Sequence, residues 1–432
     1  MHALHLSIGA ILSLGMTGML FWSLFLMRTL FASQYRVYTQ PHWQNTAVVA
    51  VNYRETEGVV RKSLNSVLSG TKTPSLFVVV FNGPEIGYER SLAKEYSDKI
   101  VFIFLEKGDK RRAMRRGATY VIQDNLFRKE TEQIHYIVHM DGDTIWRKDT
   151  LEELVKPFVD ERIDAVAAAQ HYLNEDETTW TMTQALLSHW GHTVGQKWQS
   201  AVFSASCLRG RTNAFRIEVL MQNGFLEEFS EWYFVGNRRK SGDDGTLTFL
   251  VIKYNWINKR KRGGTFVQMS SVIDTLAEPG WDKFCKMRVR CMTNTHTRYF
   301  DAIIRSWFWA QSWRFKLEFV TSVLIPMGFF TCTLTFVTAC IIAMDPYKIE
   351  TLHSRLAPVF LFVWYMAGRF LRAPIWAFKG IRLLRWPKMV FAMLFPLVGL
   401  RWWAMIIIFV PQKDWGSRND KTIAIGFQES GD

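Results

Sequence analysis

Short hydrophobic runs alternate with longer polar segments between residue 46 and about residue 284. The runs are rich in β-branched and aromatic residues, which is typical of buried strands. Polar, helix-compatible segments separate the first four runs, and this alternation predicts an α/β domain with a parallel sheet and helices on its faces. We expect strands at residues 47–51, 76–81, 101–105, 135–139 and 165–168.

A longer apolar run covers residues 4–27 and is followed by Arg28 and Arg36. A hydrophobic stretch of ~20 residues is long enough to cross a bilayer. The run is too long for a signal peptide, its start lacks Lys or Arg, and it ends in no small-residue cleavage site. We therefore interpret residues 1–40 as an N-terminal transmembrane segment with Arg28 on the cytosolic side.

The composition changes again after residue 284. Tryptophans at 307, 309 and 313 interleave with basic residues, which predicts helices lying in a membrane interface over residues 291–318. Residues 319–344 carry no charge and are long enough to span, whereas residues 389–410 are interrupted by Pro396 and Arg401. The interruption favours a broken or re-entrant segment. We expect transmembrane or re-entrant helices over 319–411 and a loop and tail over 412–432.

Charge and composition support a membrane setting. The net charge is +14, and the 432 residues include 18 Trp and 32 Phe. Lys and Arg cluster beside the apolar runs, as on the cytosolic face of a membrane protein, so we do not expect nucleic acid as a partner. The five cysteines show no metal-binding spacing, which fits a reducing compartment. We expect a multi-pass protein of the plasma membrane with a cytosolic α/β domain.

The first candidate site is the acid pair Asp141 and Asp143, which directly follows a predicted strand. Asn52, Asn82 and Lys107 also follow predicted strands, and the carboxyl ends of parallel strands meet at one edge of a sheet. Carboxylate oxygens suit Mg²⁺ or Mn²⁺ better than Zn²⁺. The sequence therefore predicts a divalent-cation site at this edge, next to the phosphates of a nucleotide.

The second candidate site is the acid pair Asp243 and Asp244 within Ser-Gly-Asp-Asp-Gly, residues 241–245. One of these carboxylates could act as a general base on an acceptor hydroxyl. Residues 246–254 are expected to form a helix, whose N-terminus would favour an ionised acid.

The order of these motifs resembles that of the family-2 processive glycosyltransferases, the group that holds hyaluronan, chitin and cellulose synthases, and within it the type 3 capsular polysaccharide synthases. The resemblance implies a GT-A (Rossmann-like) cytosolic glycosyltransferase domain over residues 41–290, joined to transmembrane and interfacial helices. The segments that carry it are residues 78–84, 141–146, 151–158, 207–216 and 241–244.

The resemblance also implies roles for individual residues. Asp143 would bind the metal and Asp244, beside Asp243, would be the catalytic base. A loop around Trp415 would close over the bound nucleotide, which requires it to lie on the cytosolic side. Donor contacts are expected from Asn52, Tyr53, Glu55, Asn82, Lys107, Lys110, Arg111, Asp141, Arg290, Trp415 and Arg418, and acceptor contacts from Cys207, Gly210, Arg216 and Cys291.

The chain departs from the family pattern at several positions. Met287 and Cys291 replace the Gln and Trp of a Gln-x-x-Arg-Trp motif, and a cysteine offers no aromatic face to a sugar. Another ring, Trp281 or Trp307, would have to serve, or the acceptor is held differently. In addition, Gly245 replaces an expected arginine and Asp109 replaces an expected glycine.

Taken with the resemblance, these features favour a membrane-integrated polysaccharide synthase. It would transfer sugar from a UDP-sugar to a growing polysaccharide with inversion, and translocate the polymer. Two alternatives stay open: a single-sugar transferase acting on a lipid-linked acceptor, and a non-catalytic membrane protein on a degenerate transferase fold. The donor sugar, the linkage and the oligomeric state are not fixed by the sequence.

Overall fold

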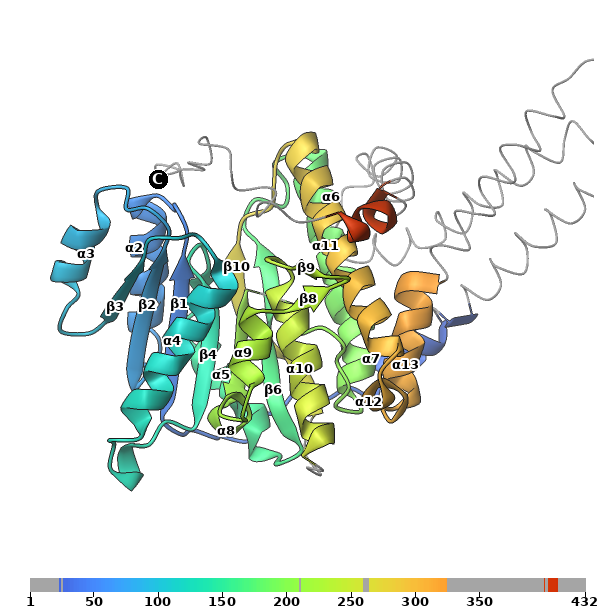
Figure 1. Ribbon diagram of the computed structural model, residues 1–432, viewed down its shortest axis with the longest axis horizontal. Coiled ribbons are helices and arrows are strands. Elements are labelled where there is room, and N and C mark those ends of the chain that lie inside the picture. The colour runs from blue at the N-terminus through green and yellow to red at the C-terminus, as the bar shows by residue number, and fades with distance from the viewer. Residues whose placement is uncertain are drawn as a thin grey trace, which may run out of the picture.

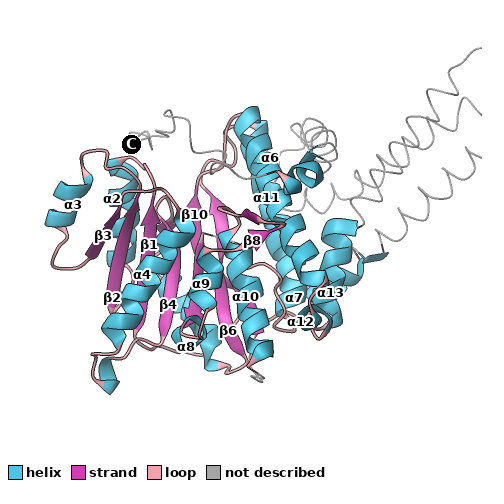
Figure 2. Ribbon diagram, viewed as in Figure 1, coloured by secondary structure: helices cyan, strands magenta, loops and turns pink. Residues whose placement is uncertain are grey.

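The structure is a computed structural model that describes residues 23–24, 26–209, 211–258, 264–324, 400 and 403–410. In this part of the chain a central sheet is covered by helices on both faces (Figures 1 and 2). Most of the predicted membrane segments lie outside the described residues, as do Gly210, Trp415 and Arg418.

The described residues form one eight-stranded mixed sheet in the order β3-β2-β1-β4-β7-β6-β10-β5. The four strands on one side, from β3 to β4, are parallel. β7 is antiparallel to both of its neighbours, and β5 is antiparallel to β10. The strands are β1 (Thr46–Asn52), β2 (Leu76–Asn82), β3 (Val101–Leu105), β4 (Tyr136–Asp141), β5 (Ile145–Trp146), β6 (Ile163–Tyr172), β7 (Thr212–Arg216) and β10 (Gly264–Thr275), with β8 (Tyr233–Phe234) and β9 (Asn237–Arg238) in a separate hairpin.

The helices divide between the two faces of the sheet (Figure 1). α4, α9 and α10 cover one face, and α2 and α5 cover the other. The helices are α2 (Glu57–Leu68), α3 (Glu89–Glu95), α4 (Lys110–Asn125), α5 (Thr150–Val155), α6 (Thr179–Trp190), α7 (Lys197–Ser200), α8 (Ile217–Leu220), α9 (Phe225–Ser230), α10 (Asp243–Ile257), α11 (Trp281–Ile303), α12 (Ser306–Trp309) and α13 (Trp313–Phe319).

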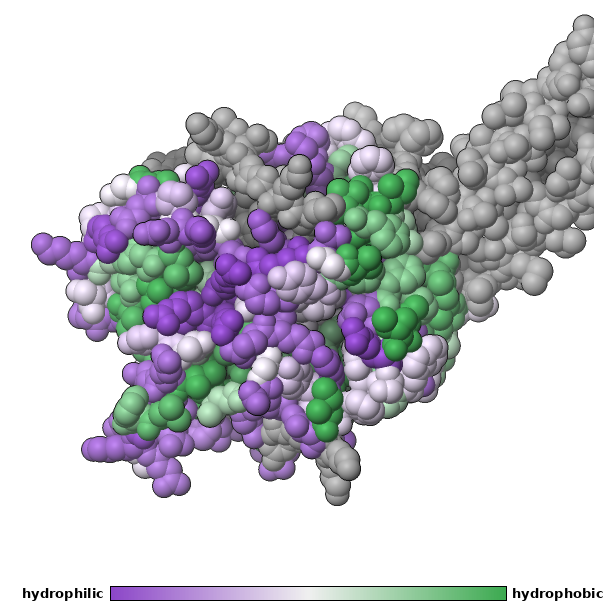
Figure 3. Space-filling model, in the orientation of Figure 1, coloured by the Kyte–Doolittle hydropathy of each residue, from purple (hydrophilic) through white to green (hydrophobic). Residues whose placement is uncertain are grey.

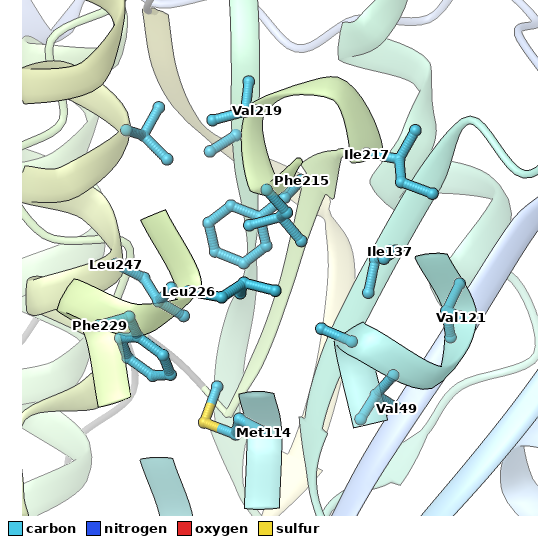
Figure 4. Close-up of a cluster of buried hydrophobic side chains, with 14 of the residues drawn as sticks. Val49, Met114, Val121, Ile137, Phe215, Ile217, Val219, Leu226, Phe229 and Leu247 are labelled. Carbon is cyan, nitrogen blue, oxygen red and sulfur yellow. The ribbon is translucent and has the colours of Figure 1, made fainter. Parts of the chain in front are cut away.

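Each face of the sheet has its own hydrophobic core. Along β1, Val49 belongs to the core beneath α4 and α10, and Val48 belongs to the core beneath α2 and α5. Successive strand side chains point to opposite faces, so a strand buried on both faces is hydrophobic throughout. Figure 4 shows the first core, where Met114 of α4, Phe229 of α9 and Leu247 of α10 gather over the sheet.

The five predicted strands are all present, and in four of them one or both ends differ from the predicted ends by one to four residues. The prediction of a parallel sheet is correct for β1, β2, β3 and β4 but incomplete, because the sheet is mixed. β7 and β10 were not predicted as strands. The helix expected over residues 246–254 is the longer α10.

Helices α11, α12 and α13 follow the sheet domain in sequence and form one side of the molecule. α11 runs from Trp281 to Ile303, so the boundary expected at residue 290 falls inside a helix. Figure 3 shows hydrophobic side chains gathered on the side where these helices lie. Over the described ranges, none of the helices is both long and apolar enough to span a membrane.

Candidate active site

The ends of the parallel strands bring several predicted donor residues together. Asn52, Asn82 and Asp141 each end a strand, and the register places Val51 beside Asp141 and Asn52 beside Phe81. Both asparagine side chains are buried, at 2% and 3% exposure. The predicted convergence of these residues on one edge of the sheet is therefore confirmed.

Gly142 lies between the two acids of the first pair and packs against Asn52. Its backbone N–H donates to the carbonyl oxygen of Val51 at 3.0 Å. A Cβ atom at Gly142 would lie 1.7 Å from Asn52 Oδ1 and 2.5 Å from its Cγ. Among the described residues, neither polar atom of the Asn52 amide has a hydrogen-bond partner. A buried amide left in this way is suited to donate to and accept from a ligand.

Tyr53 provides an aromatic surface next to these amides. A Cβ at Gly83 would lie 3.1 Å from the Tyr53 ring, and one at Gly108 would lie 2.6 Å from it, so both glycines permit the close approach of the ring. The backbone carbonyl of Glu55 accepts a hydrogen bond from the Tyr88 hydroxyl at 2.7 Å. Lys107 is exposed in the loop between β3 and α4.

Asp143 is held by an arginine that the sequence analysis did not assign. Arg211 Nη1 donates to Asp143 Oδ2, and the backbone carbonyl of Arg211 accepts from the Asp141 N–H at 2.8 Å. Burial opposes the charge of Arg211, but Asp143 and Asp141 raise the pKa of its guanidinium above the ordinary value. Arg211 therefore stabilises Asp143 as a carboxylate.

Lys110 joins the two acid pairs. Its Nζ lies 2.5 Å from Asp141 Oδ1 and 2.7 Å from Asp243 Oδ2. Burial opposes the charge of this ammonium, but Asp141, Asp243 and Asp244 raise the pKa of Lys110 above its ordinary value. The predicted donor residue thus also contacts the predicted catalytic segment.

Arg111 lies elsewhere than predicted. Its side chain is fully buried, and Nη2 donates to the Ser241 carbonyl at 2.6 Å and to Thr246 Oγ1 at 2.9 Å. Burial lowers the pKa of the Arg111 guanidinium to about 10. Successive helix residues point about 100° apart, so Lys110 and Arg111 cannot both face the strand ends. Arg111 anchors the loop before α10 instead of facing a nucleotide.

The second acid pair forms the first turn of α10. Gly242 precedes it with φ 79°, and a Cβ there would lie 2.7 Å from Asn294 Cγ, so both the conformation and the space favour glycine. Burial opposes ionisation of Asp243, but Lys110 lowers its pKa. Burial and the adjacent Asp243 raise the pKa of Asp244 well above the ordinary value.

Asn213 of β7 lies against Asp244, with its amide 3.4 Å from Asp244 Oδ1. We orient this amide so that its nitrogen donates to the carbonyls of Thr212 and Leu208, because the opposite orientation faces acceptor with acceptor. Its oxygen then faces Asp244, and only a protonated carboxyl can donate to it. This arrangement agrees with the raised pKa of Asp244.

The expected acceptor residues only partly gather around Asp244. Cys207 precedes Leu208, whose N–H donates to Thr248 Oγ1 on α10 at 3.0 Å. Cys291 is exposed on α11, with Sγ 3.8 Å from Met287 Sδ, and Arg290 is half-buried on the same helix. The predicted Gln-x-x-Arg-Trp equivalent is thus a stretch of α11.

The two rings considered as substitutes for the missing tryptophan differ in exposure. Trp307 is 5% exposed and packs against Phe249, so it is not available to a sugar. Trp281 is 44% exposed and lies 4.4 Å, centroid to centroid, from the ring of Trp180. Of the two, only Trp281 presents an accessible aromatic surface.

Arg216 lies at the wrong edge of the sheet for the acceptor role that we expected. β7 is antiparallel to β4, and Arg216 pairs with Tyr136, the first residue of that strand. Asp141 is five residues further, or about 17 Å at ~3.3 Å per residue. The Arg216 guanidinium donates to the carbonyls of Ile163 at 2.8 Å and Phe158 at 2.7 Å, so it ties strands and loops together.

Two functional features escaped the sequence analysis. Arg211 lies inside the quoted 207–216 segment, but its approach to the acid edge depends on β7, which was not predicted. Asp109, noted only as a departure, caps α4 by accepting from the Arg112 N–H and also pairs with Arg238 Nη1 at 2.6 Å. It thus joins the β8–β9 hairpin to the loop beside Asn82, whose Oδ1 accepts from the Asp109 N–H.

A strand edge bearing buried amides and an acid pair, opposite a second acid pair on a helix N-terminus, fits a GT-A-like α/β fold and is suited to glycosyl transfer. Residues 47–220 match the model of the family described as Glycosyl transferase family 2. The resemblance seen in the motifs is thereby confirmed.

Curated relatives share this character at low identity. The chain is 21% identical over 353 residues to a type 2 glycosyltransferase of Zymoseptoria tritici, a match that covers 76% of this chain and 66% of the relative. It is 26% identical over 215 residues to hyaluronan synthase of Streptococcus pyogenes, covering 49% of this chain and 50% of the relative. Chitin synthase A of Colletotrichum graminicola is 24% identical over 190 residues, covering 41% of this chain but 10% of that enzyme. The chain thus spans less than two thirds of the length of each of these relatives.

A similar solved structure supports the fold assignment. A mannosyltransferase from Pyrobaculum calidifontis, solved in complex with GDP-Man and Mn²⁺, superposes with a TM-score of 0.59. The superposition covers 94% of this chain and 98% of that one, with 13% sequence identity. At this identity the likeness shows the fold.

Proposed function

We propose that this chain is a membrane-integrated polysaccharide synthase that transfers sugar from a UDP-sugar to a growing polymer with inversion. The observation that carries the proposal is the position of Lys110, whose ammonium contacts Asp141 at the strand edge and Asp243 on α10. This contact sets the predicted base Asp244 next to the predicted donor edge. Inversion needs such a base on the acceptor hydroxyl, opposite the departing diphosphate.

The donor would lie along the strand ends. The Asn52 amide, which has no hydrogen-bond partner among the described residues, and the ring of Tyr53 suit a nucleobase and its ribose. Lys110 lies near the acids. Asp243, kept ionised by Lys110, helps to position that ammonium. Once the Asp244 carboxyl has lost its own proton, it would accept the proton of the acceptor hydroxyl.

The residues present fit a divalent cation in their chemistry. Asp143 supplies a hard carboxylate oxygen, and Mg²⁺ or Mn²⁺ is commonly held by one or two carboxylates together with substrate phosphates. Within the described ranges no group of three or more His, Cys, Asp or Glu side chains forms a cage, so the diphosphate would complete the ligand set. The bound cation would neutralise the charge of the leaving diphosphate. Arg211, which pairs with Asp143, would compete with the cation for this carboxylate.

The proposed membrane location rests on the sequence and on the surface of the last helices. Residues 4–27 and 319–344 are long apolar runs. Shortly before the second run in sequence, Trp309 is 61% exposed and Trp313 is 50% exposed. Figure 3 shows hydrophobic side chains gathered on the side of the molecule where α12 and α13 lie. Amphipathic tryptophans are typical of the membrane interface. The plasma membrane, with the catalytic domain in the cytosol, is the location that these features favour.

The test is a panel of UDP- and GDP-sugars incubated with the purified full chain and Mg²⁺ or Mn²⁺, with measurement of released nucleotide and product size. Polymer formed from one or two UDP-sugars without added lipid supports the proposal. Product of one added sugar, formed only with a lipid acceptor, would support the single-transfer alternative. Asp244→Asn should lower kcat by about 10²–10⁴-fold, with Asp98→Asn at an exposed position as the control. Full synthesis by Asp244→Asn would remove Asp244 as the base.

A further inference from the structure

Position 245 follows the proposed base directly and is a glycine, where the resemblance led us to expect an arginine. In the structure this position is not empty. A Cβ atom built on Gly245 would lie 0.6 Å from Nη1 and 1.8 Å from Cζ of Arg298. The space in which a side chain at position 245 would begin is therefore filled by the guanidinium of an arginine from α11.

Arg298 reaches this place because α11 packs beside α10 (Figure 1). Its side chain is 6% exposed, and its guanidinium lies 5.5 Å from the centroid of the Phe249 ring on α10. One turn earlier on α11, Asn294 accepts a hydrogen bond from Ser241 Oγ at 3.0 Å. One face of α11 thus contacts both the loop before the acid pair and the first turn of α10.

The hydrogen bonds of Arg298 are long and few for a buried cation. Nη1 donates to Cys207 Sγ at 3.6 Å, and Nη2 donates to Thr295 Oγ1 at 3.5 Å. Among the described residues it forms no ion pair, and its Nε has no hydrogen-bond partner. A buried guanidinium without a carboxylate contact is costly. This cost is offset where the guanidinium stabilises a nearby negative charge.

The nearby charge is that of Asp244. The groups that act on its ionisation are Asp243 on the same helix, Lys110 from α4, Asp141 from β4 and Arg298 from α11. The two other acids oppose its ionisation, and the two cations favour it. Lys110 is already in contact with Asp141 and Asp243, so Arg298 is the cation of this set without a carboxylate of its own.

We propose that Arg298 supplies from α11 the positive charge that position 245 lacks, and so acts as a positioning residue for Asp244. Its contact with Cys207 also links the base to the segment expected to line the acceptor. This inference rests on the proposed function, because it assigns Arg298 a role only if Asp244 is the base.

The test compares variants that separate charge, bulk and position. Arg298→Met keeps an apolar stem on Phe249 but removes the charge, and Arg298→Lys keeps the charge. We expect Arg298→Met to lower kcat by about ten- to a hundredfold, with a smaller change in the donor KM, and to shift the acidic limb of the kcat profile to higher pH. Arg298→Lys should keep the wild-type limb and recover part of kcat.

A second set of variants places an arginine at position 245. Gly245→Arg alone places the start of a new side chain in the space that the Arg298 guanidinium occupies, and should lower the thermal stability and the activity. The double variant Gly245→Arg with Arg298→Ala removes this overlap and should be more active than Arg298→Ala alone. Wild-type kcat and pH profile in Arg298→Met would overturn the inference, as would a folded double variant no more active than Arg298→Ala. If Asp244→Asn keeps full synthesis, the proposed base fails; if it is inactive while Arg298→Met is normal, only the present inference fails.

Discussion

Replacing Gly142 with alanine should damage the strand edge in a way that can be measured. The new Cβ would lie 1.7 Å from Asn52 Oδ1, 2.5 Å from Cγ and 3.1 Å from Cα. Rotation of the terminal amide alone cannot relieve the Cγ contact, so the whole Asn52 side chain or the 141–143 turn must move. Asn52 is 2% exposed, so this side chain is buried.

Overpacking of this kind costs about 1–3 kcal/mol. At about 2–4 °C of Tm per kcal/mol for a domain of this size, Gly142→Ala should unfold about 2–12 °C below the wild type. Because Asp141 and Asp143 flank the glycine, we also expect the donor KM to rise. The assay is thermal unfolding of the purified full chain in detergent, followed by donor KM from nucleotide release.

Gly58 provides the control, since a Cβ there meets nothing within 4 Å and Gly58 lies in α2, where alanine is favoured. Gly58→Ala should leave both Tm and KM at wild-type values or raise Tm slightly. A second variant, Gly142→Ala with Asn52→Ala, removes the overlap and should recover Tm but not KM. Wild-type Tm and KM in Gly142→Ala would refute the packing described around Asn52.

Other predictions follow from the charges at the site. Because burial and Asp243 raise the pKa of Asp244, the base keeps its proton to higher pH, and kcat should fall on acidification well above pH 4, as a pH–rate profile will show. Asp143→Asn should raise the Mn²⁺ concentration for half-maximal activity by more than about tenfold in a metal titration; an unchanged titration would exclude Asp143 as a ligand. Arg216→Met should lower the free energy of unfolding by about 3 kcal/mol, because it removes its carbonyl contacts and leaves Asp164 buried. The KM values of the folded variant should not change, and a higher acceptor KM at normal stability would restore the binding role.

The parts of the fold found from sequence are those whose burial leaves a simple pattern. β1, β2 and β4 are buried on both faces, and apart from His139 and the polar residues at their ends they are hydrophobic. β7 begins with Thr212 and Asn213, which are buried but polar, so no hydrophobic run marks it. β10 is interrupted by a register shift between Gln268 and Val272, which breaks the alternation.

The same reasoning explains which site residues were placed correctly. Strand ends in a parallel sheet share an edge whatever the rest of the fold, so Asn52 and Asp141 could be paired from sequence alone. The edge of the sheet at which Arg216 lies could not be predicted in this way, because it depends on the direction of β7. Arg111 differs from Lys110 by one helical step, and only the packing of α4 decides which of the two faces the acids.

Lys110 serves as a counter-ion to both acid pairs. Nucleotide binding and the ionisation of Asp243 and Asp244 therefore depend on the same ammonium group. A diphosphate that draws this ammonium toward itself weakens its contact with Asp243, and the acid pair then binds a proton more tightly. By thermodynamic reciprocity, nucleotide binding then takes up protons, and the affinity for nucleotide decreases as the pH rises through that ionisation. The enthalpy of nucleotide binding, measured by calorimetry, should therefore change with the ionisation enthalpy of the buffer, and Lys110→Met should abolish that dependence.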